Sequence, residues 1–197
     1  MYITDPAAED IRPTMDIDIS LSITTLNDLE NLRLELLKRG FSQTSEDSVI
    51  CRFRYKDIKV DVMNTIELGW APANKWFAAG FENRESVQVM NQTIFILSLP
   101  YFLASKFVAY NSRGANDPRM SHDFEDIVYI IDNHTTVEQE ILKADEEVCL
   151  FLKNEFVSIQ KSSIKQEAIE SNLAYIGKNT RFKLFMDKVA SIIQALN

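Results

Sequence analysis

The chain has 197 residues, of which 46% are hydrophobic and 25% are charged, a composition typical of a folded globular protein. Its 29 acidic residues outnumber its 21 basic ones, and the net charge of −8 argues against non-specific nucleic-acid binding, which relies on Lys and Arg. No apolar run reaches the roughly 20 residues that cross a bilayer, no signal peptide is evident, and two cysteines allow no disulfide framework. We therefore expect a cytoplasmic protein without a membrane partner.

The first part of the chain carries the pattern of strands around one helix. Residues 15–23 alternate between apolar and polar side chains, which is the period of a half-buried strand. Thr25 has the position of a helix N-cap, and leucines at helical spacing follow it up to Gly40, a residue type that suits the end of a helix. Two further strands are predicted at 49–55 and 58–63, with a tight turn between them.

The middle of the chain changes character near Ser98. Residues 68–81 predict an irregular connection anchored by aromatic side chains, and 86–90 predict a short strand. Beyond these, helical periodicity dominates, with Ser98 and Ser121 as expected N-caps. The predicted helices are 98–113, one starting at Ser121, 136–157, 161–176 and 179–196.

These elements predict an α+β fold in two parts. Residues 1–97 are expected to form a small mixed β-sheet core with helices, and residues 98–197 an all-α C-terminal part. The boundary between the two is placed where the period changes from that of strands to that of helices.

Three aspartates are the sharpest candidate site. Asp16 and Asp18 lie two residues apart on a predicted strand, so they share one face, with about 6.5–7 Å between them along the backbone. Asp61 has apolar neighbours and is expected to point away from the core. If the two strands are neighbours, the three carboxylates converge, and such a set without His or Cys favours magnesium or manganese. The alternative is an acidic face that is merely solvated.

Two cations form a second candidate group. Lys106 lies on the apolar stripe of its predicted helix, and Arg113 follows on the same side seven residues later. A cation in that position snorkels to water, pairs with a carboxylate or meets a phosphate. Because Asp117, Asp123 and Asp126 follow closely, a structural ion-pair cluster is the alternative to phosphate binding.

Two motifs resemble a known family. Residues 12–19 contain the pattern R-x-T-x-D-hydrophobic-D, which resembles the signature of nucleotidyltransferases related to DNA polymerase β. Lys106, Ala109 and Arg113, followed by an acidic helix, resemble the K-x-x-A-x-x-x-R motif of one branch. That branch comprises the bacterial nucleotidyltransferase toxins of abortive-infection toxin–antitoxin systems and their uncharacterised relatives. The resemblance extends over residues 12–132.

The resemblance implies a metal-dependent reaction. The protein would transfer a nucleoside monophosphate from a nucleoside triphosphate to the hydroxyl of an unspecified acceptor, and as a toxin it would have an antitoxin protein as a partner. Asp16 and Asp18 would bind Mg²⁺ or Mn²⁺. Asp61 would complete one metal site and help to activate the acceptor hydroxyl.

The resemblance also implies roles for residues around the metals. Lys106 would contact the triphosphate or the pyrophosphate leaving group. Arg113, Asp117 and Asp123 would line or brace the acceptor side. Arg12 would orient the first strand.

One departure from the family pattern concerns nucleotide binding. The family places a Gly-Gly or Gly-Ser turn before the first acidic strand, and backbone amides of that turn bind the triphosphate. No glycine precedes Gly40, so we expect the segment with this turn to be missing and nucleotide binding to be weak. A catalytically silent nucleotidyltransferase-like binding module is therefore the alternative, and an unrelated α+β domain is the third interpretation.

Overall fold

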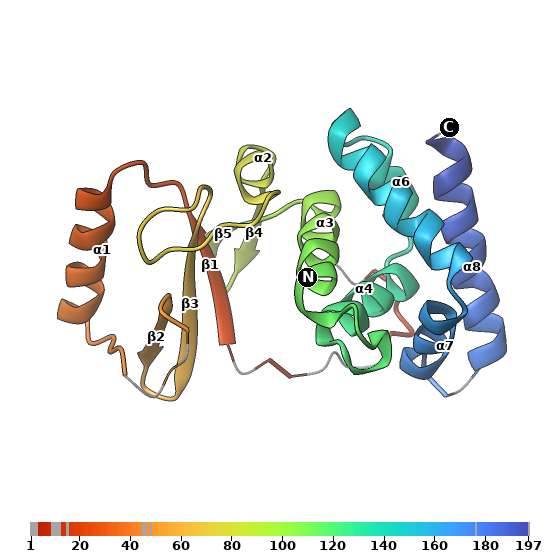
Figure 1. Cartoon of the computed structure of the whole chain (residues 1–197), viewed down its shortest axis with the longest axis horizontal. Coiled ribbons are helices and arrows are strands. Elements are labelled where there is room, and N and C mark those ends of the chain that lie inside the picture. The colour runs from red at the N-terminus through yellow and green to blue at the C-terminus, as the bar shows by residue number, and fades with distance from the viewer. Residues whose placement is uncertain are drawn as a thin grey trace. The chain divides into compact units, whose positions relative to one another are not determined.

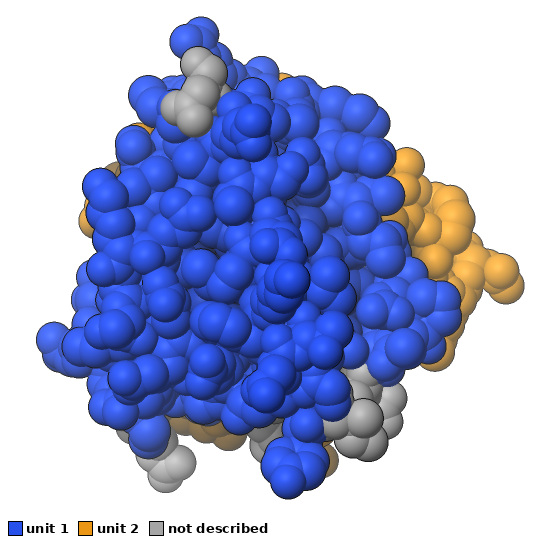
Figure 2. All heavy atoms as spheres, turned by 90° about the vertical axis from the view of Figure 1, so that its right-hand side faces the viewer, with its two compact units in different colours: residues 1–11, 98–197 blue, residues 12–97 orange. Residues whose placement is uncertain are grey.

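The computed structural model describes residues 4–8, 13–14, 16–44, 47, 49–175 and 177–196. The chain divides into two compact units (Figures 1 and 2): a sheet unit of residues 12–97, and a helical unit of residues 1–11 and 98–197. All strands of the described residues lie in the sheet unit, so the predicted α+β fold with a small sheet and a helical C-terminal part is confirmed. Residues 1–11 group with the helical unit, whereas the sequence pattern assigns them to the sheet part.

The sheet unit is built on three strands. β1 is parallel to β3, β2 is antiparallel to β3, and β3 therefore lies in the middle of the order β1–β3–β2 (Figure 1). β4 and β5 form a separate antiparallel hairpin. The elements of this unit are β1 (Asp16–Leu21), α1 (Leu26–Lys38), β2 (Arg52–Tyr55), β3 (Ile58–Asn64), α2 (Phe77–Glu82), β4 (Glu85–Val89) and β5 (Gln92–Ile96).

Helix α1 covers the apolar face of this sheet. Its predicted cap is confirmed, since the Thr25 side chain accepts a hydrogen bond from the backbone N–H of Asp28. Partly buried leucines of α1 pack against a buried cluster that Phe53, Val60 and Val62 form on β2 and β3. Because side chains alternate along a strand, the residues between these core positions are directed to the opposite face of the sheet.

A buried amide fixes how β1 ends against β3. Asn64, the last residue of β3, is fully buried, and its side-chain oxygen accepts from the backbone N–H of Ile23 at 2.9 Å. Its side-chain nitrogen donates to the carbonyl of the same residue at 2.8 Å. These paired bonds hold the chain that leaves β1 in a single register on β3.

The structure corrects two expectations in the sheet unit. Ile17 and Ile19 are about half exposed, at 51% and 41%, because β1 is an edge strand and the apolar cluster that α1 covers lies on β2 and β3. β5 is not predicted by the sequence, because its apolar residues continue into the next helix without a break. The turn before it contains Met90 and Asn91, both with positive φ, of which Asn91 is the typical residue for such a hairpin.

The helical unit begins with a helix whose last turn widens. α3 continues directly into a π-helical segment, a feature that is often found at functional positions. The predicted Ser121 cap of α4 is confirmed by its hydrogen bond from the backbone N–H of Phe124. The elements are α3 (Leu99–Ala109), the π-helix η1 (Tyr110–Gly114), the 3₁₀ helix η2 (Pro118–Met120), α4 (His122–Asn133), α5 (Val137–Ile141), α6 (Glu146–Lys161), α7 (Ser163–Asn172) and α8 (Lys178–Ala195).

The helix predicted over residues 136–157 is two helices. The chain turns between α5 and α6, and the Asp145 carboxylate at this turn accepts a hydrogen bond from the hydroxyl of Tyr101. α6 then runs on to Lys161, so the break predicted near Ser158 falls at Ser162 instead, where the Ser162 side chain caps α7. None of the helices described here combines the length and the apolar character that spanning a bilayer requires.

Gly114 holds η1 close to the start of α4. A Cβ atom at this position would lie 2.3 Å from Ser121 Oγ and 2.8 Å from Ser121 Cβ. We predict that Gly114→Ala lowers the free energy of unfolding by about 1–3 kcal/mol, because the added methyl group must displace the Ser121 side chain that caps α4. Urea denaturation of both proteins measures the change. Unchanged stability of Gly114→Ala would show that the two segments separate without cost.

Candidate functional site

The three predicted aspartates share the polar face of the sheet. β1 and β3 are neighbours, as their convergence requires, and Asp18 is the direct register partner of Asp61. Asp16 lies two residues before Asp18 on the same strand and therefore on the same face. Asp61 lies between the buried Val60 and Val62, as its apolar neighbours predict. The sheet thus brings carboxylates of two strands together.

An arginine that the sequence analysis did not single out lies among these carboxylates. Arg52 on β2 is the register partner of Asp61 on the other side, and its Nε and Nη2 donate to the two Asp61 oxygens at 2.7 and 2.6 Å. Its Nη2 also lies 3.7 Å from Asp16 Oδ2 on the far strand. The side chains of Arg52 and Asp61 are only 18% and 14% exposed.

The electrostatics of this face follow from that pair. The hydrogen bond with Asp61 raises the pKa of the Arg52 guanidinium above its ordinary value, so Arg52 stays charged. Burial, followed by the charge of Asp61, raises the pKa of the nearby Cys51 thiol, and Asp18 adds to the same effect. The negative charges of Asp18 and Asp61 therefore both act on the Cys51 thiol, although the two residues belong to different strands.

The carboxylates of this face are of the donor type that hard divalent cations prefer, but the structure does not gather them around one point. Three carboxylates offer oxygen ligands, and a guanidinium already takes the place of a cation against two of them. Ser20 continues the same face of β1, and its buried Oγ has no hydrogen-bond partner among the described residues. Within that part of the chain, no three His, Cys, Asp or Glu side chains are gathered closely enough to hold a metal ion as they lie. Asp61 has Arg52 as its cationic partner instead.

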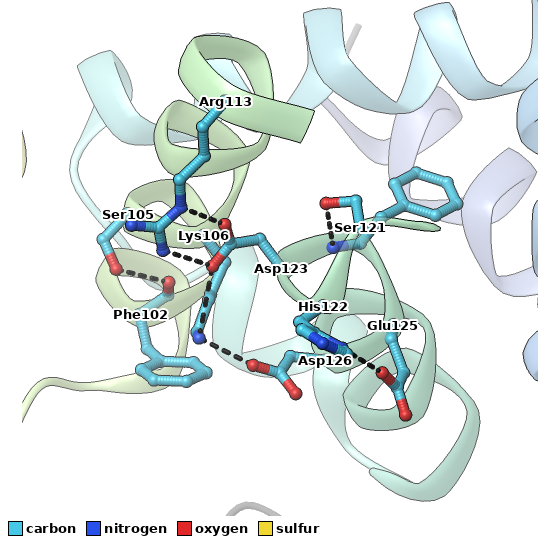
Figure 3. Close-up of polar contacts among 10 residues, drawn as sticks. Phe102, Ser105, Lys106, Arg113, Ser121, His122, Asp123, Glu125 and Asp126 are labelled. Atoms are coloured by element: carbon cyan, nitrogen blue, oxygen red, sulfur yellow. Dashed lines mark hydrogen bonds and ion pairs between the residues drawn. The ribbon is translucent and has the colours of Figure 1, made fainter. Parts of the chain in front are cut away.

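The second group of predicted residues forms one ion-pair network in the helical unit (Figure 3). Lys106 Nζ donates to Asp126 Oδ2 at 2.6 Å and lies 3.5 Å from Asp123 Oδ1. Arg113 donates through Nε and Nη2 to the two oxygens of Asp123 at 2.8 and 3.0 Å. Lys106 therefore pairs with carboxylates, which is one of the outcomes that its place on an apolar stripe allows.

Asp123 is the centre of this network. Its side chain is 7% exposed, and burial alone would favour its neutral form. The hydrogen bonds and charges of Arg113 and Lys106 outweigh burial and hold the pKa of Asp123 below its ordinary value. Arg113 belongs to the π-helical segment, so the widened turn determines where its guanidinium meets Asp123.

A surface hollow of about 420 Å³ adjoins this network. Asp117, predicted with the same group, lines it but pairs with Arg119, at 2.9 Å from Nε. His122 lies at the same hollow and pairs with Glu125 at 3.0 Å. The lining residues are Arg113, Gly114, Asn116, Asp117, Met120, Ser121, His122 and Asp123.

The predicted residues thus fall into two groups, each described within its own unit. Asp16, Asp18 and Asp61 belong to the sheet unit, and the Lys106 network belongs to the helical unit. Arg12, predicted to orient the first strand, lies outside the described residues.

Arg52 is the main residue of the site that sequence reasoning missed. The signal was present in the alternation Arg52, Phe53, Arg54, in which the buried Phe53 directs both arginines to the polar face. The sequence does not reveal the register of β2 on β3. That register places Arg52, and not Arg54, opposite Asp61.

Comparison with known proteins gives no relative. No family model matches the chain, and no curated protein or solved structure matches it either. The function is therefore argued from the residues and their geometry.

We predict that Asp123→Asn lowers the free energy of unfolding at pH 7 by about 1–3 kcal/mol, because it removes the charged acceptor that Lys106 and Arg113 share. The pKa of Asp123 is depressed, so its contribution is present above the ordinary value of 3.8 and is lost as the pH falls through the folded-state value. The variant and the wild type should therefore converge in acid. Urea denaturation at pH 7 and below pH 3.8 measures both.

A matched control is Asp117→Asn. Asp117 also pairs with an arginine, but it lies at the surface, where solvent screens the pair, so its loss should leave stability close to that of the wild type. Equal stability of wild type and Asp123→Asn at both pH values would contradict the central role of Asp123.

Proposed function

We propose that this chain is a metal-dependent nucleotidyltransferase-like protein that transfers a nucleoside monophosphate from a nucleoside triphosphate to an acceptor hydroxyl. The observation that carries the proposal is the parallel pairing of β1 and β3, which sets Asp18 directly opposite Asp61. Like charges in directly opposite positions of a sheet destabilise it. Functional sites are among the places where such local conflicts are found.

The neighbouring row of the sheet has the opposite imbalance of charge. There Asp16 is the register partner of Lys59, which in turn is the partner of Arg54, so two cations lie beside one carboxylate. In the row of Asp18 and Asp61, two carboxylates lie beside Arg52. Mg²⁺ or Mn²⁺ is the cation that the proposed reaction would add to this row.

The proposed reaction assigns a task to each group. The acceptor oxygen forms a bond to the α-phosphorus while the bond to the bridging oxygen breaks, and pyrophosphate leaves with that electron pair. Asp16, Asp18 and Asp61 would hold the divalent cations, which would supply neutralisation of charge at the phosphates and at the attacking oxygen. Asp61 would help to remove the proton of the acceptor hydroxyl. Within the helical unit, Lys106 is the cation that the resemblance assigns to phosphate, and Asp123, itself paired with Arg113, positions it.

A catalytically silent binding module is the second candidate. The bidentate pair of Arg52 with Asp61 favours it, because the guanidinium already supplies the positive charge that this carboxylate needs. In that case the partner would be a protein such as an antitoxin. We place either activity in the cytoplasm, in keeping with the two buried free cysteines.

We predict that manganese binds to the wild-type protein and not to the variant Asp16→Ala/Asp18→Ala, because two of the three carboxylate ligands are then absent. Isothermal titration calorimetry measures both. Equal, negligible heats in the two proteins would remove the metal site from the proposal.

Asp18→Asn serves as the structural control for this site. Because Asp18 lies opposite another carboxylate, its neutralisation relieves repulsion, and the melting temperature in metal-free buffer should stay unchanged or rise. A large drop would identify the aspartate as a structural residue.

Release of pyrophosphate separates the enzyme from the silent module. With manganese and a mixture of the four nucleoside triphosphates, we predict pyrophosphate release by the wild type and background release by Asp18→Asn. If the wild type binds manganese but releases no pyrophosphate above the level of Asp18→Asn, the binding module is the better description.

A further inference from the structure

The hairpin of β4 and β5 is a sheet of its own (Figure 1). Among the described strands, β4 and β5 pair only with each other. A hairpin of two strands is at best marginally stable in water, and further strands or a packed helix are needed to stabilise it. Its apolar side chains are only partly covered, since Phe95 and Ile94 on β5 are 62% and 37% exposed. The outer edge of β5 therefore offers its backbone N–H and C=O groups to another strand.

The absence of charge distinguishes β5 from the other edges. Charged side chains on an edge strand prevent it from pairing with another chain. β1 has Asp16 and Asp18, β2 has Arg52 and Arg54, and β4 begins with Glu85. β5, with the sequence QTIFI, is the one strand of the described part of the chain without a charged side chain. It also contains no proline, so each of its residues is able to pair.

We propose that β5 pairs antiparallel with β5 of a second copy of this chain, so that two hairpins form one four-stranded sheet. Charge selects the second copy as the occupant. Because each copy has a net charge of −8, association needs a surface on which no like charges meet, and β5 is such a surface. An uncharged edge also gives a strongly acidic or basic strand no ion pair. This inference does not depend on the metal site of the proposed function.

The position of Ile94 determines the register of the pair. Ile94 is the middle residue of β5, so only a two-fold axis at Ile94 pairs all five residues of the strand with the same five of the second copy. Ile94 then lies opposite Ile94 of the second copy, and Phe95 lies opposite Thr93 of the second copy. Pairs of an aromatic with a β-branched side chain stabilise a sheet, so the exposed Phe95 gains a favourable neighbour.

The first test is sedimentation equilibrium over a series of protein concentrations. An edge of five residues is small beside the roughly 1,200 Å² that stable complexes bury, so the wild type should form a weak dimer with a Kd of about 100 μM. Thr93→Lys should raise this Kd about tenfold, because it places two like charges diagonally across the axis and replaces the β-branched neighbour of Phe95 twice in each dimer.

Gln88→Lys is the matched control for Thr93→Lys. Gln88 on β4 is the register partner of Thr93, and its side chain donates to the Thr93 hydroxyl at 2.7 Å. Both substitutions remove this hydrogen bond and add the same charge, but only Thr93→Lys puts that charge on the pairing edge. Gln88→Lys should therefore keep the Kd of the wild type.

Three outcomes would overturn the proposal. A wild type that is still a monomer at about 1 mM leaves the edge of β5 to a strand of another protein. Dimers that Thr93→Lys does not weaken are formed through another surface. Equal weakening by Thr93→Lys and Gln88→Lys would assign the effect to the hairpin itself and not to its edge.

Disulfide formation tests the register. Ile94→Cys should link two copies under mild oxidation, because Cβ atoms in directly opposite positions lie about 4.5–5.5 Å apart, close to the spacing in a disulfide. Gln92→Cys, on the same strand and the same face, should not, since it lies opposite Ile96 of the second copy. The native thiols of Cys51 and Cys149 are buried and are the same in both variants. Equal amounts of linked dimer on non-reducing gel electrophoresis would contradict the proposed pairing.

Discussion

The pairing of β1 with β3 is the constraint on which the acidic site depends. In a strand, successive side chains point to opposite faces, so a slip of one residue would turn Asp16 and Asp18 toward the face that α1 covers. The two hydrogen bonds of Asn64 to Ile23 secure the register at the end where the chain leaves β1. A fully buried amide with both of its polar atoms bonded is therefore what keeps the aspartates on the polar face.

Charge compensation is the second feature that the two units share. A carboxylate that loses most of its hydration needs a cation or hydrogen-bond donors, and each unit supplies arginine or lysine from a neighbouring element. Asp61 receives Arg52, and Asp123 receives Arg113 and Lys106. Any ligand that takes one of these charged groups as its partner would replace an ion pair that already exists, so the free energy of its binding would be the difference between two sets of interactions.

Local rules predicted much of the fold from the sequence. The strands β1 and β3 and the caps Thr25 and Ser121 depend on neighbouring residues alone, and the structure confirms them, although only β3 alternates between buried and more exposed residues. β5 escaped prediction because an apolar run has no period that separates a short strand from the start of a helix. The sequence did not predict the interruption between α5 and α6 either, because no glycine or proline marks the end of the first helix.

The sequence predicted how site residues of one strand lie relative to one another, but it did not predict how residues of different strands meet. Asp16 and Asp18 share a strand, so their common face follows from the spacing, whereas their relation to Asp61 needed the pairing of two strands distant in the chain. Arg52 shows the same limit more strongly. Its neighbour Phe53 reveals which face it occupies, but only the antiparallel register of β2 on β3 places it against Asp61. The row Asp18, Asp61, Arg52 across the three strands is thus a property of the folded sheet, in which the guanidinium of the third strand meets the middle one of the carboxylates that the other two strands supply.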